Sequence, residues 1–192
     1  MLWPSYFTFY PKIKMINIDF NNFNCIKYFE NVFNEEQNAK IWNDYLSNAK
    51  WKYGHTSIPN SNNKFWKNDL IESDFFTIEL FSTIQNLIGN NFEILKCYAN
   101  GHTAFQEGDY HIDSEDDDEY TLLYYPMNEW TPEWCGETTF ILPSGEFQYV
   151  LPIPNGAVLF PGSWLHCGRA PSLKMPYGLR IVVIYKLKRI NT

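Results

Sequence analysis

The chain has 192 residues, of which 45% are hydrophobic and 19% are charged, a composition typical of a folded domain rather than a disordered chain. No apolar run approaches the roughly 20 residues that a membrane-spanning helix needs, so we expect no membrane partner. The net charge of −7 argues against a nucleic-acid partner, because nucleic-acid binding depends on a basic surface.

The N-terminal part of the chain contains patterns for strands and for two helices. Apolar and polar residues alternate in places from Phe7 to Phe20, which predicts one or two edge strands. Asn34, with Gln37 three positions later, is a capping pattern, and apolar residues at helical spacing follow it, which predicts a helix. A second helix is predicted from Asp74 to Ile88, with Gly89 as its stop.

Between these helices, residues Gly54 to Asn68 are polar and include Pro59 and several asparagines. We interpret this segment as a loop near the edge of the domain. It is either a mobile flap over a site or a simple connector, and connectors are the commoner case.

From Phe92 onward the pattern changes to short strands separated by glycines and prolines. The predicted strands are Phe92–Tyr98, Thr121–Tyr125, Thr138–Leu142, Phe147–Leu151, Ala157–Phe160, a short strand beginning at Trp164-Leu165-His166, and Arg180–Leu187. We therefore predict a single α+β domain, mainly β, over residues 1–192. In it, residues 1–90 form N-terminal strands and supporting helices, residues 91–190 form an antiparallel jelly-roll core, and the helices pack on one face of this core.

The four cysteines are scattered along the chain and form no Cys-x-x-Cys pair. Residues 1–5 lack the basic start and the small-residue cleavage pattern of a secretory signal. We therefore expect reduced thiols and a cytoplasmic location.

The most informative feature of the sequence is His111-Ile112-Asp113, followed much later by His166. Alternate side chains of an extended segment point to the same face, so residues 111 and 113 can bind one ion together. His166 follows a predicted buried strand and a Pro161-Gly162 turn, and an antiparallel fold can bring such a strand beside the pair. Two imidazoles and one carboxylate form the facial triad that holds non-haem Fe(II) and leaves positions open for substrate and dioxygen. A His-x-Asp pair alone often arises by chance, so the prediction depends on the other residues.

Arg180 stands at the head of the apolar run Ile181–Tyr185. A guanidinium in such a place needs a paired anion, because burying an uncompensated charge is costly. Its fork of donors suits a carboxylate, which predicts a dicarboxylate cosubstrate. Lys174 and Arg169 are rival anchors, but Lys174 lies in a proline-bounded loop whereas Arg180 opens a clear strand.

An acidic run, Glu115 to Glu119, follows directly behind the His-x-Asp pair. It is either a surface that attracts a basic peptide or a solvated turn, and we favour the turn.

From Lys96 to Lys186, about half of its length, the chain resembles the catalytic core of the Fe(II)/2-oxoglutarate-dependent dioxygenases, and within them the prolyl 4-hydroxylase branch. The motifs that carry this resemblance, in the order that the family uses, are Cys97-Tyr98, Gly101, His111-Ile112-Asp113, Thr121–Tyr125, Asn128-Glu129-Trp130, Gly136-Glu137-Thr138, Pro154-Asn155-Gly156, His166-Cys167-Gly168 and Arg180. The chain departs from the family pattern at Cys135, where a second glycine is common, and in a longer separation between His166 and Arg180.

The resemblance implies a double-stranded β-helix, which is the jelly roll of this family, and a set of roles for the site residues. His111, Asp113 and His166 would be the iron ligands. Arg180 would pair with the far carboxylate of 2-oxoglutarate, which serves as cosubstrate together with dioxygen, and ascorbate is a further candidate cofactor.

The strand after the metal pair adds further candidates for binding the cosubstrate. Members of this branch often direct a tyrosine hydroxyl from this strand to the far carboxylate. Counting alternate inward positions from Thr121 gives Leu123 and Tyr125, so we choose Tyr125 over Tyr124. Tyr98 matches an earlier tyrosine of the family near the metal-binding end of the cosubstrate, with core packing as an equally weighted alternative.

By this resemblance, the chain would hydroxylate an unactivated C–H bond and release succinate and carbon dioxide. The expected substrate is a prolyl residue in a peptide or protein, and a free amino acid or other small molecule is the alternative. Two rivals are a metal- or ligand-binding β-barrel without catalytic activity and a nucleic-acid demethylase, which the acidic composition disfavours. The sequence indicates no oligomeric state.

Overall fold

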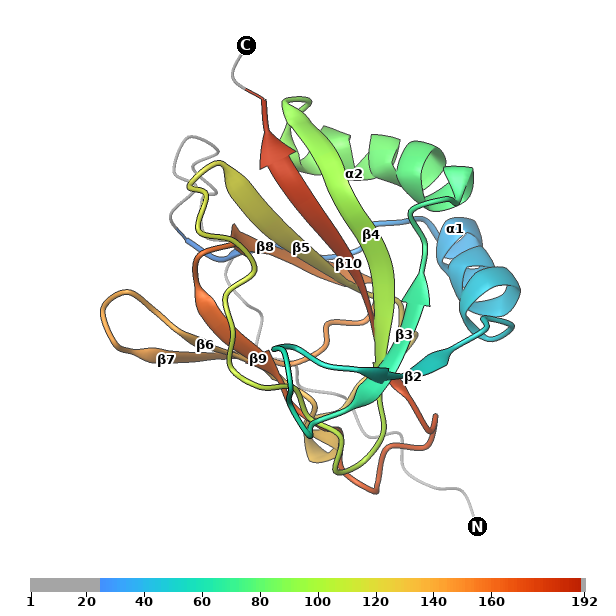
Figure 1. The fold of residues 1–192 in the computed structure, drawn as a ribbon. Coiled ribbons are helices and arrows are strands. Elements are labelled where there is room, and N and C mark those ends of the chain that lie inside the picture. The colour runs from blue at the N-terminus through green and yellow to red at the C-terminus, as the bar shows by residue number, and fades with distance from the viewer. Residues whose placement is uncertain (1–24, 191–192) are drawn as a thin grey trace.

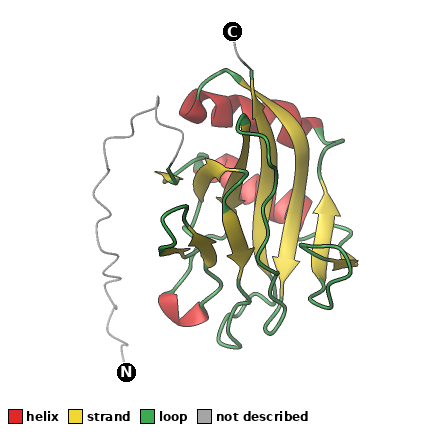
Figure 2. Ribbon diagram, turned by 60° about the vertical axis from the view of Figure 1, so that its left-hand side comes forward, coloured by secondary structure: helices red, strands yellow, loops and turns green. Residues whose placement is uncertain are grey.

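The structure, a computed structural model, describes residues 25–190 and consists of two antiparallel sheets with helices on one side (Figure 1). The larger sheet has the strand order β1-β8-β5-β10-β4-β3-β2, and the smaller has the order β7-β6-β9. Figure 2 shows the helices of residues 35–46 and 75–88 packed along one face of the larger sheet. The predicted fold, an antiparallel jelly-roll core with helices on one face, is confirmed. The strands predicted from Phe7 to Phe20 lie outside the described residues.

Ten strands and five helical segments follow one another along the described part of the chain. The strands are β1 (Lys27–Phe29), β2 (Lys52–His55), β3 (Phe65–Asp69), β4 (Phe92–His102), β5 (Glu119–Tyr125), β6 (Thr138–Ile141), β7 (Phe147–Val150), β8 (Gly156–Pro161), β9 (Leu165–Gly168) and β10 (Arg180–Arg189). The helices are α1 (Glu35–Lys40), the π-helix η1 (Ile41–Leu46), the π-helix η2 (Phe75–Leu80), α2 (Phe81–Ile88) and the 3₁₀ turn η3 (Pro132–Trp134).

Both predicted helices are confirmed, together with the cap of the first and the stop of the second. The Asn34 side chain accepts a hydrogen bond from the backbone N–H of Gln37, whose side chain in turn accepts one from the N–H of Asn34. This reciprocal cap begins α1. The second helix ends at Ile88 because Gly89 adopts a φ of +103°, which is accessible to glycine at little cost. Each helix contains a π-helical stretch that the sequence pattern did not indicate.

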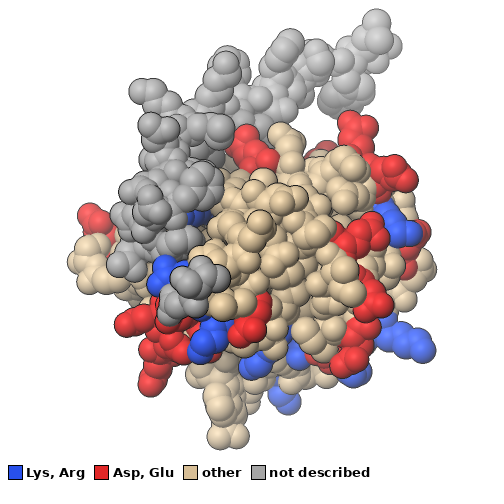
Figure 3. All heavy atoms as spheres, turned by 90° about the horizontal axis from the view of Figure 1, so that it is seen from above, with Lys and Arg blue, Asp and Glu red and all other residues tan. Residues whose placement is uncertain are grey.

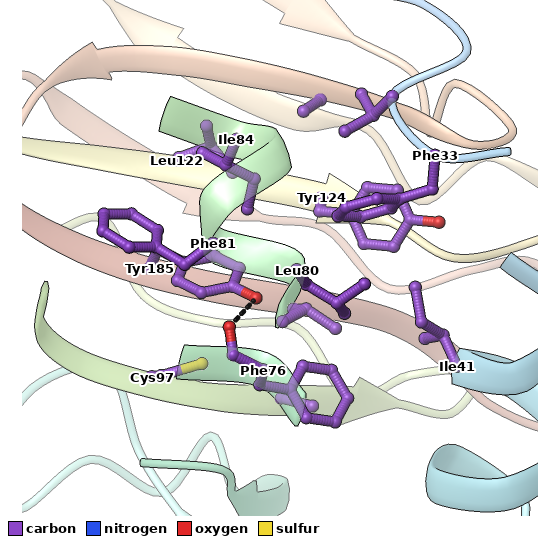
Figure 4. Packing of buried hydrophobic residues seen from close by; sticks show 14 of the residues in the cluster. Phe33, Ile41, Phe76, Leu80, Phe81, Ile84, Cys97, Leu122, Tyr124 and Tyr185 are labelled. Atoms are coloured by element: carbon purple, nitrogen blue, oxygen red, sulfur yellow. Dashed lines mark hydrogen bonds between the residues drawn. The ribbon is translucent and has the colours of Figure 1, made fainter. Parts of the chain in front are cut away.

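The central strand β10 separates two hydrophobic clusters. Ile181, Val183 and Tyr185 pack on the helix side, whereas Val182 and Ile184 face the smaller sheet. Figure 4 shows the helix-side cluster, in which the Tyr185 hydroxyl donates a hydrogen bond to the backbone oxygen of Phe76 at 3.1 Å. Because side chains alternate along a strand, one face of β10 packs against the helices and the other faces the space between the two sheets.

The prediction that Gly54 to Asn68 is a loop is wrong in part. The segment contains the last residues of β2 and most of β3, which pairs with β4 through registers such as Lys67 with Asn100. Only Phe65 of β3 is buried, so the alternation of apolar and polar residues that identifies a strand is weak here. Backbone pairing with β4 decides the structure of β3.

The acidic run after the His-x-Asp pair lies at the surface and is partly neutralised. Lys188 pairs with Asp116 and Arg189 with Asp118, each at 2.9 Å. On the face that Figure 3 shows, acidic and basic side chains lie close to one another around an area of uncharged residues. Within the described part of the chain, the helices are too short to traverse a bilayer.

Candidate functional site

Two backbone hydrogen bonds hold His111 beside His166. The N–H of each residue donates to the carbonyl oxygen of the other, at 3.0 and 2.9 Å, and forms an isolated antiparallel bridge. The imidazole rings are therefore neighbours, with centroids 4.4 Å apart. Asp113 is anchored in the same way, because its N–H donates to the oxygen of Gly162 at 2.8 Å. The structure thus brings His166 together with the His111 and Asp113 pair, from which it is distant in the sequence.

Both imidazoles are oriented by their Nδ1 atoms. Nδ1 of His111 lies 2.9 Å from the oxygen of Asp109, and Nδ1 of His166 lies 2.9 Å from the oxygen of Trp164. A carbonyl only accepts, so each Nδ1 carries the hydrogen, and each ring in its neutral form presents a lone pair at Nε2. This backbone support is common for histidines that bind metals.

The two Nε2 atoms converge on the Asp113 carboxylate. Nε2 of His111 is 3.3 Å from Oδ1, and Nε2 of His166 is 3.4 Å from Oδ2. One ligand atom from each of the three residues lies within 4.8 Å of the others. Lone pairs that face one another at such distances repel unless a cation or a proton lies between them. Two nitrogen ligands and one oxygen ligand fit a divalent transition metal.

Burial of His166 and the charges around Asp113 keep these two residues in the protonation states that a metal requires. The His166 ring lies between Phe140 and Phe160, and its burial lowers its pKa to about 4, although the Asp113 charge opposes the shift. Burial alone would raise the pKa of Asp113, but the Lys186 ammonium and the imidazoles outweigh it and hold that pKa well below its usual range. At neutral pH, His166 is therefore neutral and Asp113 is ionised.

Arg180 is buried at the start of β10, with a relative exposure of 1%. Its Nε donates to the oxygen of Gly136, and its Nη2 donates to Oγ1 of Thr138 at 3.2 Å. A Cβ on Gly136 would lie 3.0 Å from the Arg180 side chain, and the φ of +77° at this position also favours glycine. No carboxylate among residues 25–190 forms an ion pair with Arg180. The guanidinium is charged and retains capacity for an anion.

One cavity of about 230 Å³ contains both the triad and Arg180. Two of the predicted cosubstrate residues, Tyr98 and Leu123, line this cavity. Tyr125 lies behind the wall, where its hydroxyl shares a hydrogen bond of 3.1 Å with Thr138 and its ring lies 5.8 Å from the Arg180 guanidinium carbon.

Thr121 lies near the His-Asp-His group and away from the Arg180 end of the cavity. Its hydroxyl donates to Oδ2 of Asp113 at 2.5 Å. The rival anchors are also outside the cavity lining: Arg169 pairs with Glu107 at 3.2 Å and is half-exposed, and Lys174 lies exposed in its loop.

Several residues that the sequence analysis did not single out also line the cavity. They are His55, Thr56 and Ser57 of the β2–β3 hairpin, Asn100 and His102 of β4, Thr138 of β6, and Lys186 of β10. The alternation of side chains along β4 and β10 could have identified three of them. Asn100 and His102 share a face with Tyr98, and Lys186 shares a face with Arg180.

The β2–β3 hairpin is tied to the segment that carries the triad. Asn63 donates to Oδ1 of Asp109 at 2.6 Å, and the Ser61 hydroxyl contacts the other oxygen of the same carboxylate. A Cβ on Gly108 would lie only 2.7 Å from the Ser57 hydroxyl oxygen. The hairpin therefore covers part of the cavity in addition to connecting the helices.

The chain is similar to solved structures of one group of enzymes. One is a prolyl hydroxylase from Trichoplax adhaerens in complex with a hypoxia inducible factor peptide fragment, with a TM-score of 0.64 and 18% identity over 86% of this chain and 84% of that chain. A prolyl-4-hydroxylase from Pseudomonas putida has a TM-score of 0.62 and 14% identity, over 86% and 93% of the two chains. HygX from Streptomyces hygroscopicus, with nickel, 2-oxoglutarate and hygromycin B bound, has a TM-score of 0.60 and 10% identity, over 87% and 84%.

No family model and no curated protein sequence matches the chain. At these identities the likeness concerns the fold, which is that of the prolyl hydroxylases and related 2-oxoglutarate- and iron-dependent oxygenases. The fold implied by the sequence motifs is thereby confirmed.

The buried His102 generates a prediction about the pH dependence of stability. Its Nδ1 is 2.8 Å from the oxygen of Gln106, its ring stacks on Phe65, and burial together with the Arg180 charge lowers its pKa to about 3. Below about pH 6.5, the unfolded chain therefore binds a proton at His102 that the folded chain does not, so the free energy of unfolding decreases as the pH falls. Between about pH 6 and pH 5, His102→Gln should reduce this slope by about 1 kcal/mol per pH unit.

Urea unfolding monitored by tryptophan fluorescence at the two pH values measures the slope. His55 and His166 also have lowered pKa values and contribute to the same slope, so the wild type and the variant must be compared. An equally steep slope in His102→Gln would contradict the prediction.

Proposed function

We propose that the chain is an Fe(II)- and 2-oxoglutarate-dependent oxygenase that hydroxylates an unactivated C–H bond, and that its substrate is a prolyl residue in a peptide or protein. One observation carries the proposal. A single cavity contains a partly buried His-Asp-His group and a buried guanidinium that forms no ion pair with any carboxylate in the described part of the chain. A metal ion would satisfy the first, and a dicarboxylate that also reaches the metal would satisfy the second.

His111, Asp113 and His166 would hold the Fe(II). When bound, iron with 2-oxoglutarate and dioxygen supplies the oxidising chemistry, in which 2-oxoglutarate becomes succinate and carbon dioxide and the substrate gains a hydroxyl group. The protein contributes a neutral His166, an ionised Asp113 and fixed ring orientations. Ligands that are already arranged cost little reorganisation when the metal binds.

Arg180 would bind the far carboxylate of 2-oxoglutarate. Two of its nitrogens are held by Gly136 and Thr138, so the fork is fixed before the ligand arrives. Tyr125 would support the fork through Thr138, and Tyr98 and Leu123 would form walls beside the bound cosubstrate. Thr121 would act at the metal end of the site through Asp113.

The surroundings of the cavity would help to exclude water. Val182 and Ile184 form an apolar wall, and the β2–β3 hairpin covers one side through Ser57. Excluding water strengthens electrostatic interactions within a site and protects reactive intermediates. Ascorbate as a reductant and a cytoplasmic location belong to the same proposal.

The choice of a prolyl substrate rests on the motifs in the sequence and on the similarity to two prolyl hydroxylases. A small-molecule substrate is the second candidate, because a structure with hygromycin B bound has the same fold. Succinate release measured against proline-containing peptides, free amino acids and other small molecules should be greatest with the peptides. Turnover of a small molecule alone would contradict the prolyl assignment and leave the oxygenase chemistry intact.

The metal assignment predicts a spectroscopic result. Anaerobic addition of Fe(II) and 2-oxoglutarate to the wild type should produce the weak visible charge-transfer band of the iron chelate, and His111→Ala should abolish it because one ligand is lost. His55→Ala is the matched control, because His55 lines the same cavity outside the triad and its variant should retain the band. If the wild type shows no band, the chain is not an oxygenase of this kind, and the non-catalytic barrel becomes the better account.

The role of Arg180 predicts a separate loss. In Arg180→Gln, the 2-oxoglutarate concentration that gives half of the maximal band should rise on the order of 10- to 100-fold, because charge-assisted hydrogen bonds are lost. Fe(II) binding should remain, which shows that the variant is folded. Arg169→Gln and Lys174→Gln change the rival anchors and should leave this 2-oxoglutarate concentration unchanged. If Arg169→Gln or Lys174→Gln raises the 2-oxoglutarate concentration that gives half of the maximal band and Arg180→Gln does not, the far carboxylate is assigned to the wrong residue.

A further inference from the structure

Lys186 lies on the same face of β10 as Arg180 but at the metal end of the cavity, where its ammonium contacts Oδ2 of Asp113. Thr121 lies opposite Lys186 in the register of β5 and β10. The Thr121 hydroxyl donates to the same Oδ2 at 2.5 Å and accepts from the Lys186 nitrogen at 3.1 Å. Two strands and the segment after His111 thus form a closed hydrogen-bonded ring around one carboxylate oxygen.

This ring is largely shielded from solvent. The Lys186 and Asp113 side chains are 15% and 7% exposed, and Thr121 is buried. Ion pairs on a surface contribute little, whereas loss of one partner from a shielded pair leaves an uncompensated charge. The ring therefore restricts the rotation of the Asp113 side chain more than a surface ion pair would.

We propose that Lys186 and Thr121 are positioning residues whose hydrogen bonds to Oδ2 of Asp113 keep this oxygen from binding the metal. The carboxylate then presents only Oδ1 to the metal ion that the two histidines also hold. This inference rests on the metal site of the proposed function, and neither residue needs to touch the metal or the substrate.

The hydrogen-bonding capacity of the two oxygens supports this division. Oδ2 receives one hydrogen bond from Lys186 and one from Thr121, which occupies its two lone pairs. Nε2 of His166 also lies near Oδ2, but it carries a lone pair and donates nothing. Oδ1 faces Nε2 of His111 at 3.3 Å, and both of these atoms have lone pairs available for a cation.

The two positioning residues differ in what they contribute. Thr121 supplies a neutral hydrogen bond, so its removal changes the orientation of Asp113 without changing the charge of the site. Lys186 supplies a hydrogen bond and a positive charge. Thr121→Val is therefore the cleaner test of positioning. Lys186→Met tests whether the ammonium also positions the Asp113 carboxylate.

Co(II) is a suitable probe, because its visible absorption bands weaken as the number of ligands around the ion increases. In Thr121→Val, Oδ2 loses one of its two hydrogen bonds and the released lone pair can bind the ion, so the bands should weaken, and the Co(II) dissociation constant should rise about 10-fold because the carboxylate is less well held. Thr121→Ser should restore both values. Lys186→Met should weaken the bands in the same way, and Lys186→Arg, which keeps a cationic donor, should restore them.

Lys188→Met is the matched control, because Lys188 lies on the same strand and pairs with Asp116 at the surface. It should keep the spectrum and the Co(II) affinity of the wild type. Wild-type spectra in both Thr121→Val and Lys186→Met, with Co(II) bound, would contradict this inference and leave the proposed function intact. A changed Co(II) spectrum in Thr121→Val alone would show that Lys186 is not a positioning residue. Failure of the wild type to bind Co(II) would contradict the proposed function itself.

Discussion

Strand β10 joins the core to the candidate site, because one of its faces packs against the helices and the other lines the cavity. Ile181, Val183 and Tyr185 pack against the helices, and this packing holds the strand at the centre of the larger sheet. The other face begins with Arg180 and ends with Lys186, and both residues line the cavity. A shift of one residue in the pairing of β10 would bury the wrong set of side chains, so the hydrophobic core also fixes where these two charges lie.

The second constraint is electrostatic. His111 and His166 are held by their backbones and by their Nδ1 atoms, and their Nε2 lone pairs are directed at the Asp113 carboxylate. This arrangement is unfavourable without a positive charge between the groups. Lys186 supplies a positive charge at one oxygen and leaves the other oxygen available, and the same cavity contains the free donors of Arg180. The site therefore has separate places for a cation and for an anion.

The sequence predicted helix ends well where a single residue type, such as a capping asparagine or a glycine, favours one backbone geometry. The Asn34 cap and the Gly89 stop mark helix ends that the structure confirms, and the predicted strands of the second half recur with shifts of a few residues at their ends. The β3 strand was missed because only Phe65 gives it an apolar signal, and its structure depends on pairing with a strand distant in the sequence. Propensity does not report such pairing.

The sequence by itself determined which candidate ligand groups are present: two imidazoles, one carboxylate and one guanidinium. It also determined the alternation that makes β10 two-faced. Only the tertiary structure decided which further groups share the cavity, such as Asn100 and His102, and that Thr121 contacts Asp113 while Tyr125 lies behind Thr138. The reason is that a sequence specifies which face of a strand a side chain occupies, whereas its neighbours across the cavity depend on how separate strands and hairpins pack.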